Sequence, residues 1–466
     1  MPRMKIEYGS GSIDADCPLS FDSLGMRTTD ILPDPAQAIR TSYARPIDSP
    51  PLSELARAKL ETNPQSTAVV VVSDNTRPVP YRGAGGILIP LLEILLSAGY
   101  VQERITILIG NGSHRAMTET EIEAMLGLRQ AGYQLAALNH DYEMDEDLVY
   151  VGKTLRGSPV RINRLYAQAH LRIVTGLVES HFMAGASGGR KGICPAIASK
   201  ETLKVFHGPE ILESAETSDL VLEGNPCNEE AEQAAELAGC DFAVNVTLDS
   251  SMRITGVFSG NLFSSHREAV RRIREYVSVP LDGLYDLVVI PGGFVAVNHY
   301  QAAKAAVEAT RAVKPGGMIV LVVRHNDRDP IGSREYRKTM ALLKRDGSER
   351  FLRTIKSKDW TFTHDQWQTQ MWAKVLDQIG GEENLCYCGL EIPEKEYAIL
   401  PGIPGLRYLT NEQRTSGKPA EELMNLMVSR AVAAAVETLR SRLGRDPKVL
   451  LLRDGPYGVP VTGRFG

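Results

Sequence analysis

The chain has 466 residues, of which 43% are hydrophobic and 23% are charged, as is typical of a folded globular protein. The formal net charge is −5 and no long run of one sign occurs, which argues against nucleic acid or a membrane surface as a partner and favours a small molecule. The length exceeds the size at which one hydrophobic core stops growing, so two domains are expected.

The start of the chain, MPRMKIEYGSGSI, lacks the apolar segment of a signal peptide. The apolar runs along the chain are shorter than the ~20 residues that cross a bilayer, and we therefore expect a cytoplasmic protein. Of the six cysteines, only Cys386 and Cys388 are close together. This spacing fits reduced thiols better than a disulfide framework or a four-cysteine zinc site.

Short β-branched runs bounded by Gly, Pro or Asp alternate with helical patterns along the chain. The predicted strands cover 67–73, 105–110, 171–178, 285–293 and 317–323, and predicted helices include 86–99 and 300–313. This alternation predicts an α/β protein of two domains with mainly parallel sheets flanked by helices. In such sheets, functional loops follow the carboxyl ends of the strands.

The domain break is expected near VSVPLDGL, where the basic helix 265–277 ends and a new strand begins. We therefore predict an N-terminal α/β domain over residues 1–278 and a C-terminal α/β domain over 279–446. The tail, 447–466, has a strand-and-turn pattern that is compatible with a return to the first domain.

Polar residues follow the first two predicted strands. Asp74, Thr76 and Arg77 come after strand 67–73, and by themselves they fit a capped turn as well as a binding loop. After strand 105–110, Thr118 begins a capping box for the next helix. Capping leaves His114 unexplained in the loop, although a lone loop histidine is more often solvated than catalytic.

The segment HFMAGASGGRKGICP, residues 181–195, is rich in glycine and follows a predicted strand. Its consecutive backbone N–H groups suit a phosphate or carboxylate. It is neither a P-loop, because Arg190 and Gly192 replace the required residue types, nor a dinucleotide fingerprint. The alternative is a tight glycine turn that leaves Arg190 and Lys191 in solvent.

Three reactive side chains, His181, Lys191 and His207, belong to this one connection. An amine beside a glycine-rich anion site is well placed for covalent attachment of a phosphorylated cofactor. His207 closes the helix KETLKVFHGP, where it is either favoured by the helix dipole or a metal ligand.

In the second half, Gln301 and Lys304 are three residues apart on a helix and so share one face. They either grip a carboxylate together or form a surface pair. Trp367 and Trp372 lie close together, and we expect one in the core and one in the wall of an apolar site.

Read together, DNTRP, GNGSHR, ESHFMAGASGGRKGICPA, VFHG, YQAAK and DQW resemble, in order and spacing, the nickel-dependent lactate racemase family. The similarity runs from about residue 70 to residue 372. The resemblance implies a two-domain α/β protein with the active site in the interdomain cleft. It also implies a nickel pincer nucleotide as the cofactor, that is, a nickel complex of pyridinium-3-thioamide-5-thiocarboxylic acid mononucleotide.

Carried over by position, the resemblance assigns a role to each site residue. Lys191 would be bonded covalently to the cofactor through the thioamide, and His207 would complete a square plane of one carbon, two sulfurs and one nitrogen around nickel. His114 and His181 would be the acid/base pair. The remaining residues would bind the cofactor (Asp74, Thr76, Gly185, Ser187, Gly188 and Gly189) or the substrate (Arg77, Gln301, Lys304 and Trp367).

The expected reaction is inversion of C2 of a 2-hydroxy carboxylic acid, lactate or a larger one, by a racemase or epimerase. Deprotonation of C2 would place a second negative charge beside the carboxylate, whereas reversible hydride transfer to the cofactor gives a planar 2-keto acid. Each enantiomer then needs its own base, and an unperturbed imidazole is mostly neutral near pH 7. Enzymes that synthesise the cofactor are expected as transient partners.

Two other classes of protein compete with this interpretation. An NAD-dependent 2-hydroxy acid dehydrogenase would need a GxGxxG fingerprint after a strand, and none is present. A nickel-binding or cofactor-binding protein without turnover would keep Lys191 and His207 but could dispense with His114 and His181. Ser180 and the CPA segment at 194–196 depart from the family pattern beside these residues, and they leave the substrate open.

Overall fold

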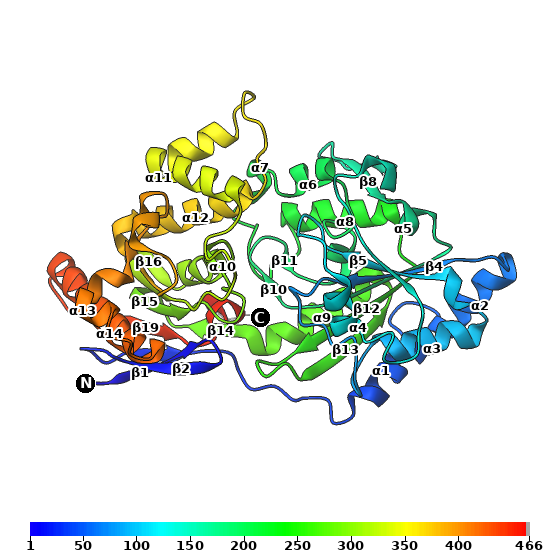
Figure 1. The fold of residues 1–466 in the computed structure, drawn as a ribbon, viewed down its shortest axis with the longest axis horizontal. Helices are drawn as coiled ribbons and strands as arrows, with labels where there is room; N and C mark the ends of the chain where they lie inside the picture. The colour runs from blue at the N-terminus through cyan, green and yellow to red at the C-terminus, as the bar shows by residue number, and fades with distance from the viewer. Residues whose placement is uncertain (463–466) are drawn as a thin grey trace. The chain divides into compact units, whose positions relative to one another are not determined.

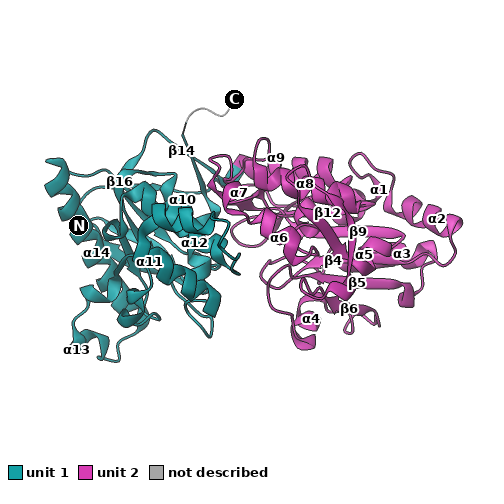
Figure 2. Ribbon diagram, turned by 90° about the horizontal axis from the view of Figure 1, so that it is seen from above, with its two compact units in different colours: residues 1–27, 276–466 teal, residues 28–275 magenta. Residues whose placement is uncertain are grey.

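The computed structural model describes residues 1–462 and divides into two compact units (Figure 2). Unit 1 combines residues 1–27 with the chain from Tyr276 onward, and unit 2 comprises Thr28–Glu275. Both units are built on six-stranded sheets with helices packed against them (Figure 1). The α/β class with parallel sheets flanked by helices is thereby confirmed.

The sheet of unit 2 has the strand order β13-β12-β9-β4-β5-β6, and only β13 is antiparallel to its neighbour. Its strands are β4 (Ala68–Ser73), β5 (Ile105–Gly110), β6 (Ala136–Asn139), β9 (Leu171–Leu177), β12 (Phe242–Leu248) and β13 (Ile254–Gly260). Strand β4 is almost continuously apolar and buried, because a central parallel strand has both faces covered.

The helices of unit 2 are α1 (Pro35–Ala44), α2 (Leu52–Thr62), α3 (Leu88–Ala98), α4 (Glu119–Leu126), α5 (Arg164–Gln168), α6 (Lys200–Phe206), α7 (Pro209–Glu213), α8 (Pro226–Ala238) and α9 (Leu262–Val277). Two antiparallel pairs lie outside the sheet: β7 (Leu148–Lys153) with β8 (Pro159–Asn163), and β10 (Ser180–His181) with β11 (Gly185–Ala186). The apolar side of α3, including Leu88 and Leu92, packs in one core with Val70 and Ile107 of the sheet.

The order of the strands creates a switch point in this sheet. From β4 the chain adds β5 and β6 on one side, and later adds β9 and β12 on the other side of β4. Ligands of open α/β sheets bind outside the carboxyl ends of the strands at such a reversal. The loops that follow β4 and β9 are therefore the favoured place for a site in unit 2.

The sheet of unit 1 is parallel throughout, in the order β18-β17-β16-β15-β19-β3. Its strands are β3 (Asp22–Leu24), β15 (Tyr285–Pro291), β16 (Val313–Val322), β17 (Leu385–Cys388), β18 (Ile403–Pro404) and β19 (Val449–Leu452). Two further pairs are β1 (Arg3–Tyr8) with β2 (Gly11–Asp16), and β14 (Ser278–Leu281) with β20 (Val459–Thr462). The helices are α10 (His299–Thr310), α11 (Arg334–Ile355), α12 (Gln366–Ile379), α13 (Asn411–Arg414) and α14 (Ala420–Leu443).

The units differ from the expected domains at both ends of the chain. The change from unit 2 to unit 1 after Glu275 lies close to the expected break after residue 278, but residues 1–27 belong with the second part of the chain. The reason is that β3 pairs with β19. The tail likewise pairs within unit 1, β19 with β15 and β20 with β14, and not with the first domain.

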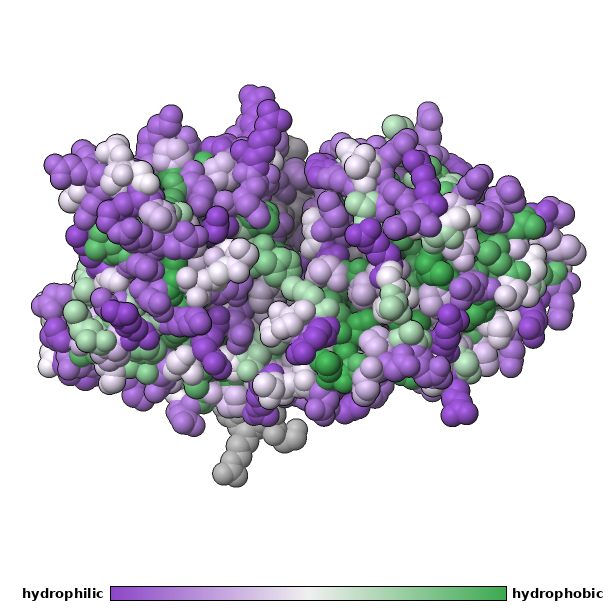
Figure 3. Space-filling view, turned by 60° about the horizontal axis from the view of Figure 1, so that its bottom comes forward, coloured by the Kyte–Doolittle hydropathy of each residue, from purple (hydrophilic) through white to green (hydrophobic). Residues whose placement is uncertain are grey.

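The face shown in Figure 3 carries mostly hydrophilic side chains, with hydrophobic ones scattered among them. Within residues 1–462, no helix is long and apolar enough to cross a membrane.

Candidate active site

The loop after β4 is built around a buried carboxylate. Asp74 is only 5% exposed, and its Oδ1 accepts hydrogen bonds from the backbone N–H of Thr76 at 3.2 Å and from the Thr76 hydroxyl at 2.6 Å. These two bonds form a turn closed by an Asp side chain. The capped turn considered from the sequence is present, and Oδ2 of Asp74 remains available for another partner.

That partner is His114, in the loop after β5. Its Nδ1 lies 2.7 Å from Oδ2 of Asp74. Burial alone would raise the pKa of Asp74, but the hydrogen bond and charge of His114, with Thr76 and Arg77, lower it below its usual value. Because Asp74 is a carboxylate, Nδ1 of His114 donates to it. In the neutral imidazole, Nε2 is then left as a proton acceptor.

Other contacts tie these loops to the connection that follows β9. Arg77 forms an ion pair with Glu179 at 3.1 Å, and both side chains are mostly buried. The backbone N–H of Gly112 donates to the carbonyl of Ala196 at 2.9 Å. The polar residues that follow β4, β5 and β9 are thus joined at one edge of the sheet, where the switch point lies.

His181 lies in the two-residue ladder of β10 and β11, opposite Gly185. Its Nδ1 accepts from the backbone N–H groups of Met183 and Ala184, each at 3.2 Å. Its Nε2 lies 2.8 Å from Nζ of Lys191. The histidine and the lysine that the sequence places ten residues apart are therefore in direct contact.

The glycine-rich segment does not offer the row of open backbone N–H groups that the sequence suggested. Within the protein, donors from this segment include Ser187 to the carbonyl of Glu179, Gly189 to Oδ1 of Asn245, Lys191 to the carbonyl of Gly188, and both Ile193 and Cys194 to the carbonyl of Arg190. These amides are not available to an anion. The segment is instead a tightly packed turn that presents Lys191.

Close packing explains the glycines of this turn. Gly185 has a φ of +76°, and a Cβ there would overlap the carbonyl oxygen of Val221. Gly189 has a φ of +51°, and a Cβ there would lie 2.6 Å from the ring of His266. Positive φ and close approach both favour glycine. Gly185, Ser187, Gly188 and Gly189 therefore have a structural task, whatever they contribute to a ligand.

Arg190 is buried, contrary to the solvent-exposed alternative considered from the sequence. It is 1% exposed, and its guanidinium donates to the carbonyls of Ala186 at 2.9 Å and Ala184 at 2.6 Å. Burial lowers the pKa of Arg190 to about 10, so it remains a cation at neutral pH. The guanidinium cation thereby holds two backbone carbonyl groups of the turn that precedes Lys191.

Lys191 and His207 both lie against the ring of Phe206. Nζ of Lys191 is 5.8 Å from the ring centroid, and the rings of Phe206 and His207 meet edge to face with centroids 4.7 Å apart. Helix α6 is capped at its start by Ser199, whose hydroxyl accepts from the N–H of Thr202, and at its end by His207. The helix thus brings one imidazole to the same aromatic ring as the reactive amine.

Lys191 and His207 are residues of unit 2 that could hold a cofactor together with a metal. His207 could supply one imidazole to a square-planar metal whose other ligands belong to a bound group. Lys191, an amine against the same aromatic ring, could tether that group. No group of three or more His, Cys, Asp or Glu side chains that could hold a metal ion occurs in residues 1–462.

In unit 1, Gln301 and Lys304 lie on the partly exposed side of α10, while its alanines are buried in the core. Asn298 caps the helix and accepts from the N–H of Gln301 at 2.9 Å. Within the described residues, Oε1 of Gln301 is buried and has no hydrogen-bond partner. An acceptor without a partner inside the protein is open to water or to a ligand.

The two tryptophans have different environments. Trp372 is fully buried and stacks on His299 with ring centroids 4.6 Å apart, so it belongs to the core. Trp367 donates from its indole nitrogen to the hydroxyl of Tyr300 at 2.8 Å. Tyr300 precedes Gln301, so Trp367 lies beside the helix that carries the candidate substrate residues.

Sequence reasoning missed Glu179 and Tyr300. Glu179 comes directly after the strand segment and two residues before His181, so its place at a strand end was a usable signal. Tyr300 adjoins Gln301, but its contact with Trp367 is between residues far apart in the sequence. No local pattern reveals such a contact.

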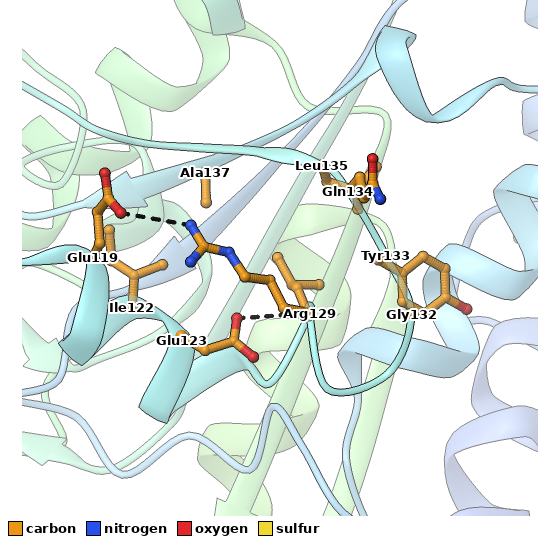
Figure 4. Close-up of a pocket in the computed structure, with 10 residues that line it drawn as sticks. Glu119, Ile122, Glu123, Arg129, Gly132, Tyr133, Gln134, Leu135 and Ala137 are labelled. Atoms are coloured by element: carbon orange, nitrogen blue, oxygen red, sulfur yellow. Dashed lines mark hydrogen bonds and ion pairs between the residues drawn. The ribbon is translucent and has the colours of Figure 1, made fainter.

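A pocket of about 610 Å³ lies elsewhere in unit 2, between α4 and the segment that leads into β6 (Figure 4). Arg129 bridges it, with an ion pair to Glu119 at 3.5 Å and a bond from its N–H to Glu123 at 3.2 Å. None of the candidate site residues lines this pocket. We assign it no part in the chemistry.

Comparison with known proteins gives a consistent result. A model of the lactate racemase N-terminal domain matches residues 8–219, and a model of the lactate racemase C-terminal domain matches residues 286–380. Lactate racemase of Lactiplantibacillus plantarum is 32% identical over 342 residues, which are 73% of this chain and 77% of that protein. The chain belongs to the lactate racemase family.

Two further proteins match most of the length of this member of the lactate racemase family. Lactate racemase of Thermoanaerobacterium thermosaccharolyticum is 29% identical over 389 residues, 81% of this chain and 86% of that protein. The structure of the lactate racemase apoprotein from the same organism aligns with a TM-score of 0.80 at 24% identity, covering 99% of this chain and 100% of that one. A protein of Thermotoga maritima aligns with a TM-score of 0.61 at 18% identity, covering 88% and 97%.

The two matched domains of the lactate racemase family contain the candidate residues. Asp74, His114, Lys191 and the rest of the unit 2 group up to His207 lie within the first match, and Gln301, Lys304 and Trp367 lie within the second. Residues 381–462 lie outside both matches, although they complete the sheet of unit 1 through β17, β18 and β19.

Proposed function

We propose that the protein is a racemase or epimerase that inverts C2 of a 2-hydroxy carboxylic acid, either lactate or a larger one. Both curated relatives above are named lactate racemases. The observation that carries the proposal is the pairing of His114 with Asp74 and of His181 with Lys191 at loops of one sheet edge. A cytoplasmic enzyme that meets the cofactor-synthesis enzymes transiently fits this proposal.

For the cofactor we propose a nickel pincer nucleotide attached through Lys191, with Nε2 or Nδ1 of His207 as the protein's ligand to nickel. When bound, this group supplies a reversible acceptor for the hydride of C2. The protein's part is to tether the group, to provide one imidazole and to leave the substrate's hydroxyl within reach of a base. Soft sulfur with imidazole in a square plane is a donor set that suits nickel.

The two catalytic histidines are set up in complementary ways. His114 donates from Nδ1 to Asp74, so its Nε2 can take the proton from a substrate hydroxyl. His181 accepts two backbone N–H groups at Nδ1, so its Nε2 carries a proton in the neutral form. The two rings proposed as the acid/base pair are thus held by different partners, a carboxylate for His114 and two backbone N–H groups for His181.

The remaining site residues have proposed roles that follow from their contacts. Asp74, steadied by Thr76, orients His114, and the turn formed by Gly185, Ser187, Gly188 and Gly189 shapes the cofactor site and presents Lys191. For the substrate's carboxylate we propose the cation of Arg77 in unit 2 and, in unit 1, the amide of Gln301 and the ammonium of Lys304. Trp367 is proposed as an apolar wall of the substrate site.

A polarimetric or chiral-chromatographic screen of 2-hydroxy acids and aldonic acids tests this function. The protein is first matured with the cofactor-synthesis enzymes, and the same protein without maturation is the control. We expect interconversion of the enantiomers or epimers of at least one acid, by the matured protein only. Matured protein that carries the cofactor adduct but inverts none of these acids would contradict the proposal.

The proposal of a cofactor carrier without turnover predicts a different outcome. Such a protein would retain its adduct after His114→Ala and would have no activity to lose. An enzyme would keep the adduct in this variant but lose inversion, so intact mass and the inversion assay together separate the two.

A further inference from the structure

Asn225 is a buried amide that makes four hydrogen bonds. It is fully buried and caps the start of α8. Its Oδ1 accepts from the backbone N–H groups of Cys227 at 2.9 Å and Asn228 at 3.2 Å. Its Nδ2 donates to the carbonyls of Met183 at 2.9 Å and Val221 at 3.0 Å. Two donors meet carbonyls and the oxygen meets N–H groups, so the amide has only one orientation that fits.

One of these carbonyls belongs to the peptide unit that faces His181. The carbonyl of Met183 and the N–H of Ala184 are the two ends of one planar peptide. The carbonyl end accepts from Asn225, and the N–H end donates to Nδ1 of His181 at 3.2 Å. Because the peptide is rigid, fixing its carbonyl also fixes the direction of its N–H. Hydrogen bonds in such a chain also polarise and strengthen one another.

We propose that Asn225 is a positioning residue for His181, which it holds through the peptide between Met183 and Ala184. Asn225 bonds to the backbone of the turn, and the turn in turn orients the imidazole. The inference rests on the proposed function for the use of His181 as an acid/base group. The orientation of the ring by Asn225 rests on the contacts alone.

The support of Asn225 is itself held firmly. Cys227, near the start of α8, donates from Sγ to the carbonyl of Phe206 at 3.7 Å. Helix α8 also packs against α6 and against residues 189–192. The start of α8 is thus fixed to the helix that His207 caps. A side chain can hold a catalytic group in place only when its own support is rigid.

The segment before Asn225 holds the same turn at a second point. The N–H of Leu220 donates to the carbonyl of Gly185 at 2.8 Å. Leu220 has a φ of +61°, which is unfavourable for a bulky residue. Such a conformation persists only where the surrounding contacts impose it, and here Arg274 of α9 bonds to the carbonyl of Leu220. The turn that orients His181 is therefore shaped by the segment packed against it.

The test separates the helix cap from the contact with Met183. Asn225→Ser keeps a good N-cap but lacks the two amide donors. In full-length protein without cofactor, ¹⁵N NMR of the ring nitrogens of His181 shows which nitrogen carries the proton, and His181→Gln assigns the signals. At about pH 9 an ordinary imidazole is neutral, and wild type should have no proton on Nδ1. Asn225→Ser should show a mixture of both tautomers.

Inversion by matured protein is the second readout. The kcat of Asn225→Ser, expressed per molecule with adduct, should fall at least about tenfold, because a catalytic group misplaced by about 1 Å can cost about 10²-fold in rate. KM should change less than about twofold, since Asn225 bonds to the backbone of the turn. A wild-type kcat in this variant overturns the proposal, and so does an unchanged spectrum of His181.

Asn163→Ser is the matched control. Asn163 is also a buried N-cap, of α5, and its amide donates to the ring of His140, a residue without a proposed part in the reaction. This variant should keep the kcat and the His181 spectrum of wild type. A change as large as that in Asn225→Ser would mean that loss of any buried capping amide has this effect, which overturns the proposal.

The wild-type spectrum decides if Asn225→Ser does not fold. A neutral His181 with its proton on Nδ1 overturns the proposal, because the N–H of Ala184 could then not donate to that nitrogen. The two proposals also fail in different ways. If matured wild type inverts no acid, the proposed function fails, and the spectra of the unloaded protein still test the positioning of His181.

Discussion

Asp74→Asn exchanges one oxygen of a buried side chain for an amide nitrogen and is expected to change the tautomer of His114. In the native protein Oδ1 accepts two hydrogen bonds from Thr76, and Oδ2 accepts from Nδ1 of His114 at 2.7 Å. In the variant, the amide oxygen will face Thr76, because the N–H and the hydroxyl of Thr76 both donate at that position. The amide nitrogen then faces His114 as a donor, so Nδ1 becomes an acceptor and the proton moves to Nε2.

With its proton on Nε2, His114 can no longer take a proton from a substrate hydroxyl. General-base catalysis by a positioned side chain contributes roughly 10²- to 10⁴-fold, so we expect kcat to fall by about that factor. The group that binds carboxylate is not touched, so KM should change little. The adduct at Lys191 should be complete, because Asp74 is bonded to His114 and Thr76 and an isosteric side chain preserves the fold.

Chiral chromatography of initial rates gives kcat and KM, and intact mass gives the adduct. Thr76→Val is the matched control, since it removes one bond to the same carboxylate and leaves Oδ2 facing His114. Its kcat should fall far less than that of Asp74→Asn, because the bond that it removes is not the one that orients His114. A kcat of Asp74→Asn within threefold of wild type, with the adduct present, would refute the assignment of His114 as the base oriented by Asp74.

Three further predictions follow from packing and charge. Gly185→Ala places a Cβ over the carbonyl oxygen of Val221, at a residue with positive φ. The free energy of unfolding, measured by denaturant titration, should fall by about 2 kcal/mol or more. The adduct at Lys191 should be lost as well. Asp286→Asn removes a buried carboxylate bonded to Lys314 at 2.8 Å, and should cost about 2 kcal/mol near neutral pH. Because the folded-state pKa of Asp286 lies below its usual value, its contribution is present above about pH 4 and is lost as the pH falls through the folded pKa, so variant and wild type should converge in acid. Gln301→Ala should raise KM about tenfold with the adduct intact, since it would remove the proposed contact with the substrate's carboxylate; unchanged KM would place Gln301 outside the site.

The sequence alone predicts those parts of the molecule whose structure depends on residues that are close together in the chain. Strand β4 is a run of valines between polar residues, and β-branched runs of that length are buried parallel strands. The capping box at Thr118 is present with both of its hydrogen bonds. The position of His114 after β5 could also be predicted, because loops at carboxyl ends of strands are where parallel sheets place their polar residues.

What the sequence could not supply depends on contacts between distant residues. Strand β3 has only three residues and a polar pattern, and it exists because β19 pairs with it. This pairing moves residues 1–27 into unit 1. Arg190 looked like a surface cation beside Lys191, but the turn directs its guanidinium at the carbonyls of Ala184 and Ala186. A buried arginine is recognised only when its acceptors are known.

The same dependence on partners separates the two histidines, which are one residue type in the sequence. A carboxylate sets the proton of His114, whereas two backbone N–H groups set that of His181. A side chain can be replaced and a backbone amide cannot, so exchanging the bonded group can reverse the tautomer of His114 but not that of His181.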